Sequence, residues 1–427
     1  MSRRLVPAIA ALTLAASGLA VAISPADARP ADVTIPSTGS DAVVKTPYAL
    51  LGSGYGTQVS GGQIPVNSGT TSFTSTGCTA RTGVEKSNTE AASTLPGGLG
   101  TVGAVDTQLF TRKDGNRIGV VSKHSVAGVT LNLGGQASLG LSALTSTAFA
   151  YHNKTGFHSQ TETTIGGLSI TIAGVTQTLP LPTPNTPIAI PGLATISLGK
   201  TYKKTTDKLA VAQARAVQID VTATGSRVRV AGSYARMESP LKSGRLGGSA
   251  NTTRIAVLGD LITSGKTLQT LMPCVGTDGQ VQTQSAAAVN LADQIVIGAA
   301  ESSQKGTQTA KRAWGYEQAK VASVNLGNGA LVINAIQGRA YASRVKGKGV
   351  FTSSAGTTIG SITANGTEQA IPDPGQSLTI PGVASITPNV VEKIKDGIHV
   401  IALQITLLDG TGAVINIGEA KMKAERY

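Results

Sequence analysis

Short runs of alternating hydrophobic and polar residues recur along the chain and predict β-strands. SITIAGVTQTL (169–179) alternates in this way on both sides of an Ala-Gly pair. VIALQITLLDGTGAVINIG (400–418) contains two such runs separated by Asp409-Gly410, a dipeptide that favours tight hairpin turns. Both segments therefore predict antiparallel strand pairs.

A third segment predicts which side chains of a hairpin face the core. AVQIDVTATGSRVRVAG (216–232) consists of two hydrophobic runs joined by a Thr-Gly turn. Because successive side chains of a strand point to opposite faces, we expect Val228 and Val230 to face inward and Arg227 and Arg229 to face outward.

One segment has helical spacing instead. In NVVEKIKDG (389–397), the residues Val390, Val391 and Ile394 would share one face of a helix, which predicts one or two helical turns. Elsewhere the composition opposes helices, since 52 of the 427 residues are Gly and Thr, Val and Ile are abundant. We expect an all-β protein with few short helices.

The chain repeats its own sequence. IPGLATI (190–196) returns as IPGVASI (380–386), and other matches follow in the same order with gaps at turn-like segments. This is the pattern of two copies of one domain. The further matches are SGTTSFTSTGC (68–78) with SGKTLQTLMPC (264–274), NLG (132–134) with NLG (325–327), TTIG (163–166) with TTIG (357–360), and VQIDV (217–221) with LQITL (403–407).

These patterns together predict two tandem homologous antiparallel β-domains, sandwich-like and related by a pseudo-two-fold axis. The expected organisation is a signal peptide at 1–28, a linker at 29–47, a first repeat at 48–245 and a second repeat at 246–427.

Three further features stand out: PTPNTPIAIPGLATISL (182–198), the hairpin at 400–418 and the Gly-rich YGTQVSGG (55–62). Together they resemble the choice-of-anchor P family of bacterial exported proteins, which is common in actinobacteria. The resemblance implies a β-rich extracellular protein of unknown activity and carries over no functional residues. Members have varied C-terminal anchors, whereas the last residues here show neither a hydrophobic tail nor a sorting motif, so we expect no covalent attachment to the cell.

The N-terminal residues predict export. Arg3 and Arg4 precede an apolar run that ends near a small-residue site, Ala26-Asp27-Ala28. This is the pattern of a secretory signal peptide, with cleavage between Ala28 and Arg29. An uncleaved membrane anchor is the alternative, since the apolar run nearly reaches membrane-spanning length. Cleavage would release the protein from the cell, with at most a loose association with the envelope.

The two cysteines, Cys78 and Cys274, stand at matching positions of the two copies. An exported protein with an even number of cysteines usually oxidises them. We expect a Cys78–Cys274 disulfide near the axis that relates the copies. Two separate thiols or an intermolecular bridge remain the alternatives.

The chain is basic, with a net charge of +13. The excess is uneven, because residues 29–245 carry nine more basic than acidic side chains and residues 246–427 carry three more. An anionic wall polymer or lipid headgroups could bind the first repeat, and that association should weaken as salt rises. A basic surface without a dedicated partner is the alternative. Nucleic acid is disfavoured, since few aromatic side chains could stack on bases.

The segments that resemble catalytic or cofactor-binding motifs each lack a residue or partner motif that the chemistry requires. GDLITSGKT (259–267) resembles a phosphate loop, but Asp260 would repel the phosphates. The Ser-x-x-Lys matches lack the partner motifs of penicillin-binding enzymes, and no Gly-x-Ser-x-Gly element occurs. We expect no catalytic residues and no cofactor, although a Ser-His-Asp triad built from distant positions would escape this reasoning.

The chain has four histidines, His124, His152, His158 and His399. A hairpin could bring His152 and His158 together, but two imidazoles without a carboxylate or thiolate make a poor metal site. We expect a surface turn there and no metal.

Three function classes remain. A secreted, non-catalytic structural or adhesive β-protein fits the duplicated scaffold best. A glycan- or lipid-binding module is the second, and the scarcity of aromatic residues, 3% of the chain, counts against it because such sites use aromatic platforms. A hydrolase with a hidden triad is the third.

Overall fold

The computed structural model describes residues 43–61, 64–68, 71–95, 98–134, 136–181, 186–222, 225–256, 264–292, 295–408, 410 and 412–427. The predicted signal peptide, its cleavage site at Ala28 and Arg29, and the turn residues Thr224 and Asp409 lie outside them.

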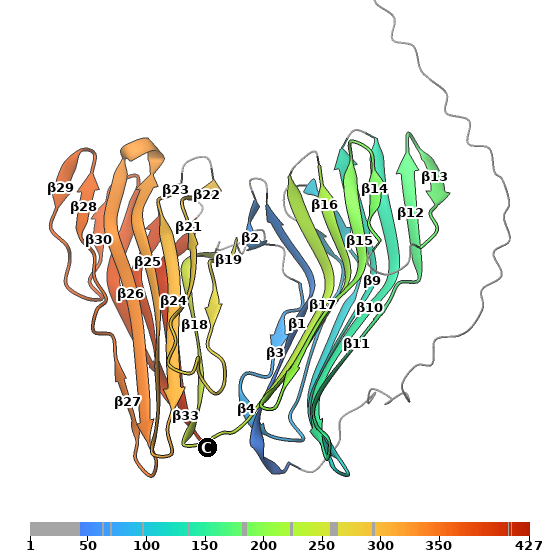
Figure 1. Ribbon diagram of the computed structural model, residues 1–427. Helices are drawn as coiled ribbons and strands as arrows, with labels where there is room; N and C mark the ends of the chain where they lie inside the picture. The colour runs from blue at the N-terminus through green and yellow to red at the C-terminus, as the bar shows by residue number, and fades with distance from the viewer. Residues whose placement is uncertain are drawn as a thin grey trace, which may run out of the picture. The chain divides into compact units, whose positions relative to one another are not determined.

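The described residues form antiparallel β-strands arranged in four sheets, two in each repeat (Figure 1). The prediction of an all-β, sandwich-like fold is therefore confirmed. No α-helix occurs in these residues, which include a short 3₁₀ turn at Gly327–Gly329. Consequently no helix of this part of the chain could span a membrane.

The first repeat contains sheets 1 and 2. Sheet 1 has the order β14 (Ile188–Ile190), β15 (Ala194–Thr206), β16 (Leu209–Val221), β17 (Ser226–Glu238), β1 (Lys45–Gly61) and β2 (Ile64–Ser68), with β3 (Thr74–Ser75) and β4 (Thr79–Arg81) also paired to β1. Sheet 2 has the order β13 (Val175–Thr178), β12 (Gly167–Ile172), β10 (Ala137–Asn153), β9 (Arg117–Gly134), β7 (Gly100–Val102) and β6 (Ser93–Leu95), joined by β11 (Gly156–Thr164), β8 (Val105–Asp114) and β5 (Glu85–Glu90).

The second repeat contains sheets 3 and 4. Sheet 3 has the order β19 (Ser264–Thr267), β18 (Gly244–Ala256), β33 (Val414–Arg426), β32 (Gly397–Leu407), β31 (Ala384–Ile394) and β30 (Leu378–Ile380), with β20 (Thr270–Leu271) paired to β18. Sheet 4 has the order β21 (Gln282–Ala286), β24 (Ala300–Gln308), β25 (Arg312–Leu326), β26 (Leu331–Val345), β28 (Ser361–Ala364) and β29 (Thr367–Gln369), joined by β22 (Val289–Ala292), β23 (Ile295–Ile297) and β27 (Val350–Ser353).

The strands differ slightly from the predicted boundaries. β1 begins at Lys45, inside the predicted linker, and β18 begins at Gly244, two residues before the predicted second repeat. Both strands pair with the last strand of their own repeat, β1 with β17 and β18 with β33.

The helix expected at 389–397 is wrong. These residues belong to β31, the following turn and the start of β32, and Val390 and Val391 pair with Ile401 and Val400 of β32. The pairing skips Asn389 and the opposite residue Ala402 without a change of register. This interruption shifts the inward–outward alternation by one position, so the hydrophobic residues acquire a spacing that resembles a helix.

Strand pairing confirms most of the sequence matches. The strand pairing places Thr74 of β3 and Thr270 of β20 at equivalent positions of the two repeats. These residues are 196 positions apart, which is the offset of the sequence match. The matches of IPGLATI with IPGVASI and of VQIDV with LQITL also fall in register. The NLG match is wrong by two residues, because register aligns Leu131 with Leu326.

Each repeat contains a line of β-bulges that runs across several strands of both sheets. At each of these interruptions the pairing skips two opposite residues, one on each strand. One residue of each skipped pair has a left-handed backbone. Bulges increase the local bend of a strand, and the long strands of the first repeat bend partway along their length (Figure 1). The left-handed residues of this bulge line are Ala143, Gly199 and Ala231 in the first repeat, and Ala335, Asn389 and Gly418 in the second.

Among the described residues, the core of each repeat has two large hydrophobic clusters, and a smaller fifth cluster contains Ala49, Ala80, Leu241 and Cys274. In the first repeat, one cluster contains Leu131, Leu139 and Ile219, and the other contains Leu50 and Met237. In the second repeat, the clusters form around Ile333 and Ile405 and around Leu246 and Met422. Aliphatic side chains from facing sheets therefore pack against one another on the inner faces of the long strands. The outer faces of the sheets are not part of these clusters.

Candidate ligand-binding surfaces

The predicted disulfide is present. The sulfur atoms of Cys78 and Cys274 are 2.00 Å apart and their Cα atoms 5.6 Å apart, and neither cysteine is free. Cys274 is buried, and its backbone N–H donates to Oε2 of Glu238 at 3.1 Å. The bond therefore joins equivalent positions of the two copies within one chain, while its place on a symmetry axis stays a prediction.

The expected hairpin does bring His152 and His158 into one region, at the turn between β10 and β11. Each has its own neutral partner: Tyr48 Oη lies 3.0 Å from His152 Nδ1, and Asn153 Oδ1 lies 2.9 Å from His158 Nε2. Burial, with a smaller effect of His158, lowers the pKa of His152. Within the described ranges, no three His, Cys, Asp or Glu side chains are grouped to hold a metal ion.

His124 and Ser122 form a pair that resembles part of a catalytic site but is sealed from solvent. Ser122 Oγ lies 2.9 Å from His124 Nε2, and Thr107 Oγ1 lies 3.0 Å from Nδ1. Both His124 and Ser122 have no exposed surface, and burial lowers the pKa of His124 to about 3. A nucleophile must meet its substrate, so this arrangement serves packing and hydrogen bonding.

Glu317 occupies the position of Ser122 in the second repeat and is also fully buried. Thr270 Oγ1 donates to its Oε2 at 2.8 Å, and the backbone N–H of Met272 also contacts it. Burial raises the pKa of Glu317 well above its usual range, because a charged carboxylate is costly away from water. Glu317 is therefore an internal hydrogen-bonding group.

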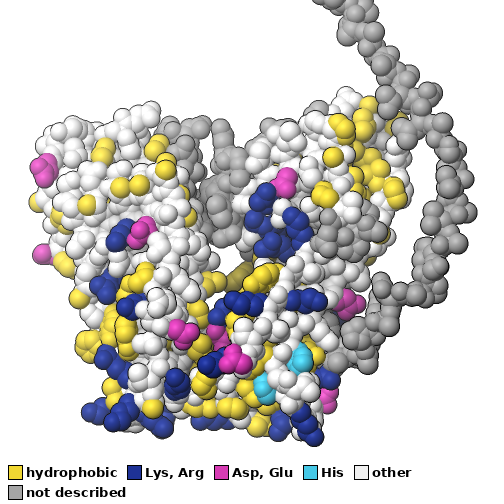
Figure 2. Space-filling model, viewed as in Figure 1, with side chains coloured by type: hydrophobic (Ala, Val, Ile, Leu, Met, Phe, Trp, Pro, Cys, Tyr) yellow, Lys and Arg dark blue, Asp and Glu magenta, His cyan; other side chains and the backbone are white. Residues whose placement is uncertain are grey.

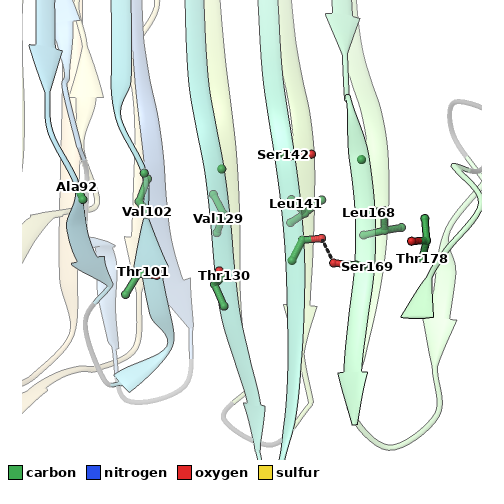
Figure 3. A pocket seen from close by; sticks show the side chains of 14 residues that line it. Ala92, Thr101, Val102, Val129, Thr130, Leu141, Ser142, Leu168, Ser169 and Thr178 are labelled. Atoms are coloured by element: carbon green, nitrogen blue, oxygen red, sulfur yellow. Dashed lines mark hydrogen bonds between the residues drawn. The ribbon is translucent and has the colours of Figure 1, made fainter. Parts of the chain in front are cut away.

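A shallow trough of about 740 Å³ lies on the outer face of sheet 2 (Figure 3). Its outward side chains include hydroxyls on neighbouring strands, while Val129, Leu141 and Leu168 are buried in the core. None of the lining side chains is charged, so the trough offers weak hydrogen bonds and no acid or base. The hydroxyl residues are Thr101, Thr130, Ser142, Ser169 and Thr178.

The outer face of sheet 4 presents aromatic side chains in neighbouring rows. Tyr316 of β25 pairs with Tyr341 of β26, and the next row runs from Trp314 through Ser343 to Phe351 of β27. The alternating residues Ala313, Ala340 and Ala342 are buried, which directs the aromatic rings away from the core. We call Trp314, Tyr316, Tyr341 and Phe351 the aromatic strip.

Basic side chains fix the rings of the aromatic strip. The Arg339 guanidinium carbon lies 4.6 Å from the ring centroid of Tyr316, and Lys305 Nζ lies 6.0 Å from that of Trp314. Arg312 Nη2 donates to Tyr341 Oη at 2.6 Å. Hydrophobic and basic side chains accordingly lie side by side over this part of sheet 4 (Figure 2). The surface is both flat and cationic.

A second basic surface lies on the outer face of sheet 1. Arg227 and Arg229 project outward from β17, as the alternation predicted, while Val228 and Val230 are fully buried. Arg215 lies on the neighbouring strand β16. Figure 2 shows basic side chains gathered over these strands. We call Arg215, Arg227 and Arg229 the arginine cluster.

Sequence reasoning found part of these surfaces and missed the rest. The outward direction of Arg227 and Arg229 followed from period-two alternation. The aromatic strip was missed because its members come from segments up to 37 residues apart, and low aromatic content argued against a platform. The alternation of Trp314 with Tyr316 was the one local signal.

No protein-family model and no curated protein matches this chain.

Proposed function

We propose that this protein is a secreted, non-catalytic adhesive protein of the cell envelope that holds a glycan chain on its aromatic strip. The observation that carries the proposal is the concentration of Trp314, Tyr316, Tyr341 and Phe351 on one flat sheet face of a chain with only 14 aromatic residues. Phe351 is 63% exposed, an arrangement that serves contact rather than the core.

The chemistry of the strip fits a saccharide. A pyranose ring has a face of C–H groups that packs on an aromatic ring, while its hydroxyls stay hydrogen-bonded at the edge. Neighbouring strands are about 4.8 Å apart, so rings on β25, β26 and β27 form a track for successive sugar units. The contacts from Arg339 and Arg312 hold two of the rings before a ligand arrives, which lowers the entropic cost of binding.

Three observations support an extracellular location. The Cys78–Cys274 disulfide is stable in an oxidising compartment. The N-terminal pattern is that of a secretory signal. The resemblance to the choice-of-anchor P family also favours an exported surface protein. The basic surfaces make an anionic wall polymer a fitting partner, with lipid headgroups as the competing one.

Trp314 is the single tryptophan of the chain, so its fluorescence reports directly on the strip. Titration with purified envelope polysaccharide should change this fluorescence and saturate. Tyr341→Ala should weaken the binding by about tenfold, because buried aromatic contacts dominate such interfaces. Tyr202→Ala is the matched control, since Tyr202 is an exposed aromatic residue of the first repeat.

Three results would contradict the proposal. Polysaccharide that leaves both the fluorescence and the retention on a glycan column unchanged would exclude the strip as a glycan site. Binding to phospholipid vesicles that is lost in Tyr341→Ala, without glycan binding, would show a lipid surface instead. Release of soluble sugar during the incubation would contradict the non-catalytic role.

A further inference from the structure

The arginine cluster of the first repeat lies in neighbouring rows of sheet 1. Arg229 pairs across the sheet with Gln58 on one side and Gln218 on the other, and Arg227 pairs with Ser60 and Asp220. Arg215 lies in the row of Gly232, on the other side of the bulge line. The three guanidinium groups therefore belong to one patch on β16 and β17.

Tyr55 completes this patch because Gly232 has no side chain. A Cβ on Gly232 would lie 2.4 Å from the Tyr55 ring, so only glycine lets the ring cross β17 at this row. The ring thereby reaches Arg215 on the far strand, and the two side chains are hydrogen-bonded. Gly232 thus fixes both Tyr55 and Arg215 at the edge of the cluster.

The positive charge of the cluster is only partly balanced. Asp220 forms an ion pair with Arg227. Arg229 has neutral partners, since its Nη1 donates to Gln58 Oε1 and Ser60 Oγ, both at 3.3 Å. Burial lowers the pKa of Arg229, and the charges of Arg215 and Arg227 act in the same direction, whereas Tyr55 and Asp220 act in the opposite direction. The charges of Arg215 and Arg227 thus disfavour the charge on Arg229, and an anion bound among the three side chains would offset this effect.

At the same location the second repeat has Ile401, Val414 and Asn416 in place of the three arginines, and a different set of charged side chains. Register places Glu419 at the position of Gly232 and Arg254 at that of Gln58. Glu419 lies 3.8 Å from Arg254 and 2.9 Å from His399, and Asn251 donates to it at 3.2 Å. The first repeat has no carboxylate at that position. In the second repeat Arg254 therefore has a carboxylate beside it, whereas in the first repeat the three arginines of the cluster share the single carboxylate of Asp220.

We infer that the arginine cluster binds a phosphate group. Three cations and one carboxylate leave a net charge of +2, which suits a phosphate dianion better than a single carboxylate. Guanidinium groups bind phosphate oxygens through paired N–H donors, and Gln58, Gln218 and Ser60 can bind further oxygens. A phosphate-bearing wall polymer and a phospholipid headgroup present the same group. The site is on the other repeat from the aromatic strip, so it goes beyond the glycan-binding proposal.

The experiment measures phosphate binding by five proteins: the wild type, Arg229→Gln, Arg215→Gln, and the controls Arg254→Gln and Tyr341→Ala. The probes are inorganic phosphate, a glycerol-phosphate polymer, vesicles containing phosphatidic acid, and polygalacturonate as a carboxylate polymer. Titration calorimetry and thermal unfolding are recorded for each. Inorganic phosphate tests the site itself, and the polymer and vesicle arms separate the two natural sources.

We expect phosphate to bind the wild type and raise its melting temperature. Arg229→Gln and Arg215→Gln should each weaken binding by about tenfold, the usual effect of losing one charge-assisted hydrogen bond. Arg254→Gln should bind as the wild type does. Without phosphate, the two cluster variants should melt no lower than the wild type, because each substitution relieves repulsion.

Equal weakening in Arg254→Gln would show diffuse attraction to a basic protein and overturn the inference. Polygalacturonate binding as tightly as the phosphate polymer, with the same loss in the cluster variants, would overturn the assignment to phosphate. Tyr341→Ala separates this test from the glycan proposal, since it should leave phosphate binding unchanged. A loss in that variant would contradict the independence of the two sites.

Discussion

The buried side chain of His124 determines which residue can stand opposite it on the facing sheet. Its Nε2 lies 1.9 Å from where a Cβ of Gly54 would be, so a glycine is required on the facing strand β1. Thr107 and Ser122 satisfy both ring nitrogens of the neutral imidazole. Because the site has no exposed surface, charging the ring costs a large desolvation energy.

This environment predicts that His124 makes the protein less stable in mild acid. The pKa of His124 is lowered to about 3 in the folded state, against 6.5 when unfolded. The unfolded chain therefore binds a proton first, and the stability present above pH 6.5 is lost as pH falls toward 3, by up to about 5 kcal/mol. Urea unfolding of the wild type and His124→Gln over this range should show a flatter pH dependence in the variant. Equal slopes would contradict the assignment.

At the scale of elements, the bulge line determines how the strands bend. Ala335 and Ala143 occupy equivalent bulges and have left-handed backbones, with φ values of 52° and 48°. A side chain in that region strains the backbone by about 1–2 kcal/mol, which glycine avoids. The strained backbone occurs in both copies at exposed positions, where the alanine methyl adds nothing to the hydrophobic core.

We therefore expect Ala335→Gly to raise the free energy of unfolding by about 0.5–1 kcal/mol, after the entropic cost of glycine. Ala322 is the matched control, because it is the partner residue of the same bulge, is exposed, and has no left-handed backbone. Ala322→Gly should lower stability by a similar amount. Denaturant midpoints measure both, and a loss in Ala335→Gly would show that the bulge does not need glycine-like freedom.

At the scale of the whole molecule, the disulfide closes a long loop. Cys78 and Cys274 are separated by 196 residues, so the bond removes much of the conformational freedom of the unfolded chain. The loop-entropy model assigns about 3–5 kcal/mol to such a bond.

Reduction should therefore lower the melting temperature of the wild type. Cys78→Ser should melt at the temperature of the reduced protein and should not respond to reductant, which makes it the control for side effects of the thiol reagent. Calorimetry with and without dithiothreitol tests this. An unchanged melting temperature of the reduced wild type would mean that the unfolded chain is already compact between these positions.

The sequence by itself determined the strands, the duplication and the paired cysteines, because each depends on local alternation or on positions that a copied domain repeats. It also oriented Arg227 and Arg229 outward, since a strand alternates with a period of two. It failed where a bulge interrupts that period, at 389–397, and where the turn before β26 differs in length between the copies, at the NLG match.

Only the tertiary structure decided where side chains from distant segments meet. The aromatic strip depends on β25, β26 and β27 lying side by side. At the arginine cluster, the ring of Tyr55 on β1 extends over Gly232 of β17, which is more than 170 residues away in sequence. Pairing between strands far apart in sequence is set by the packing of the whole sheet, which local patterns do not encode. For the same reason, the sequence could not show that His124 and Glu317 are buried, which the packing of the facing sheets determines.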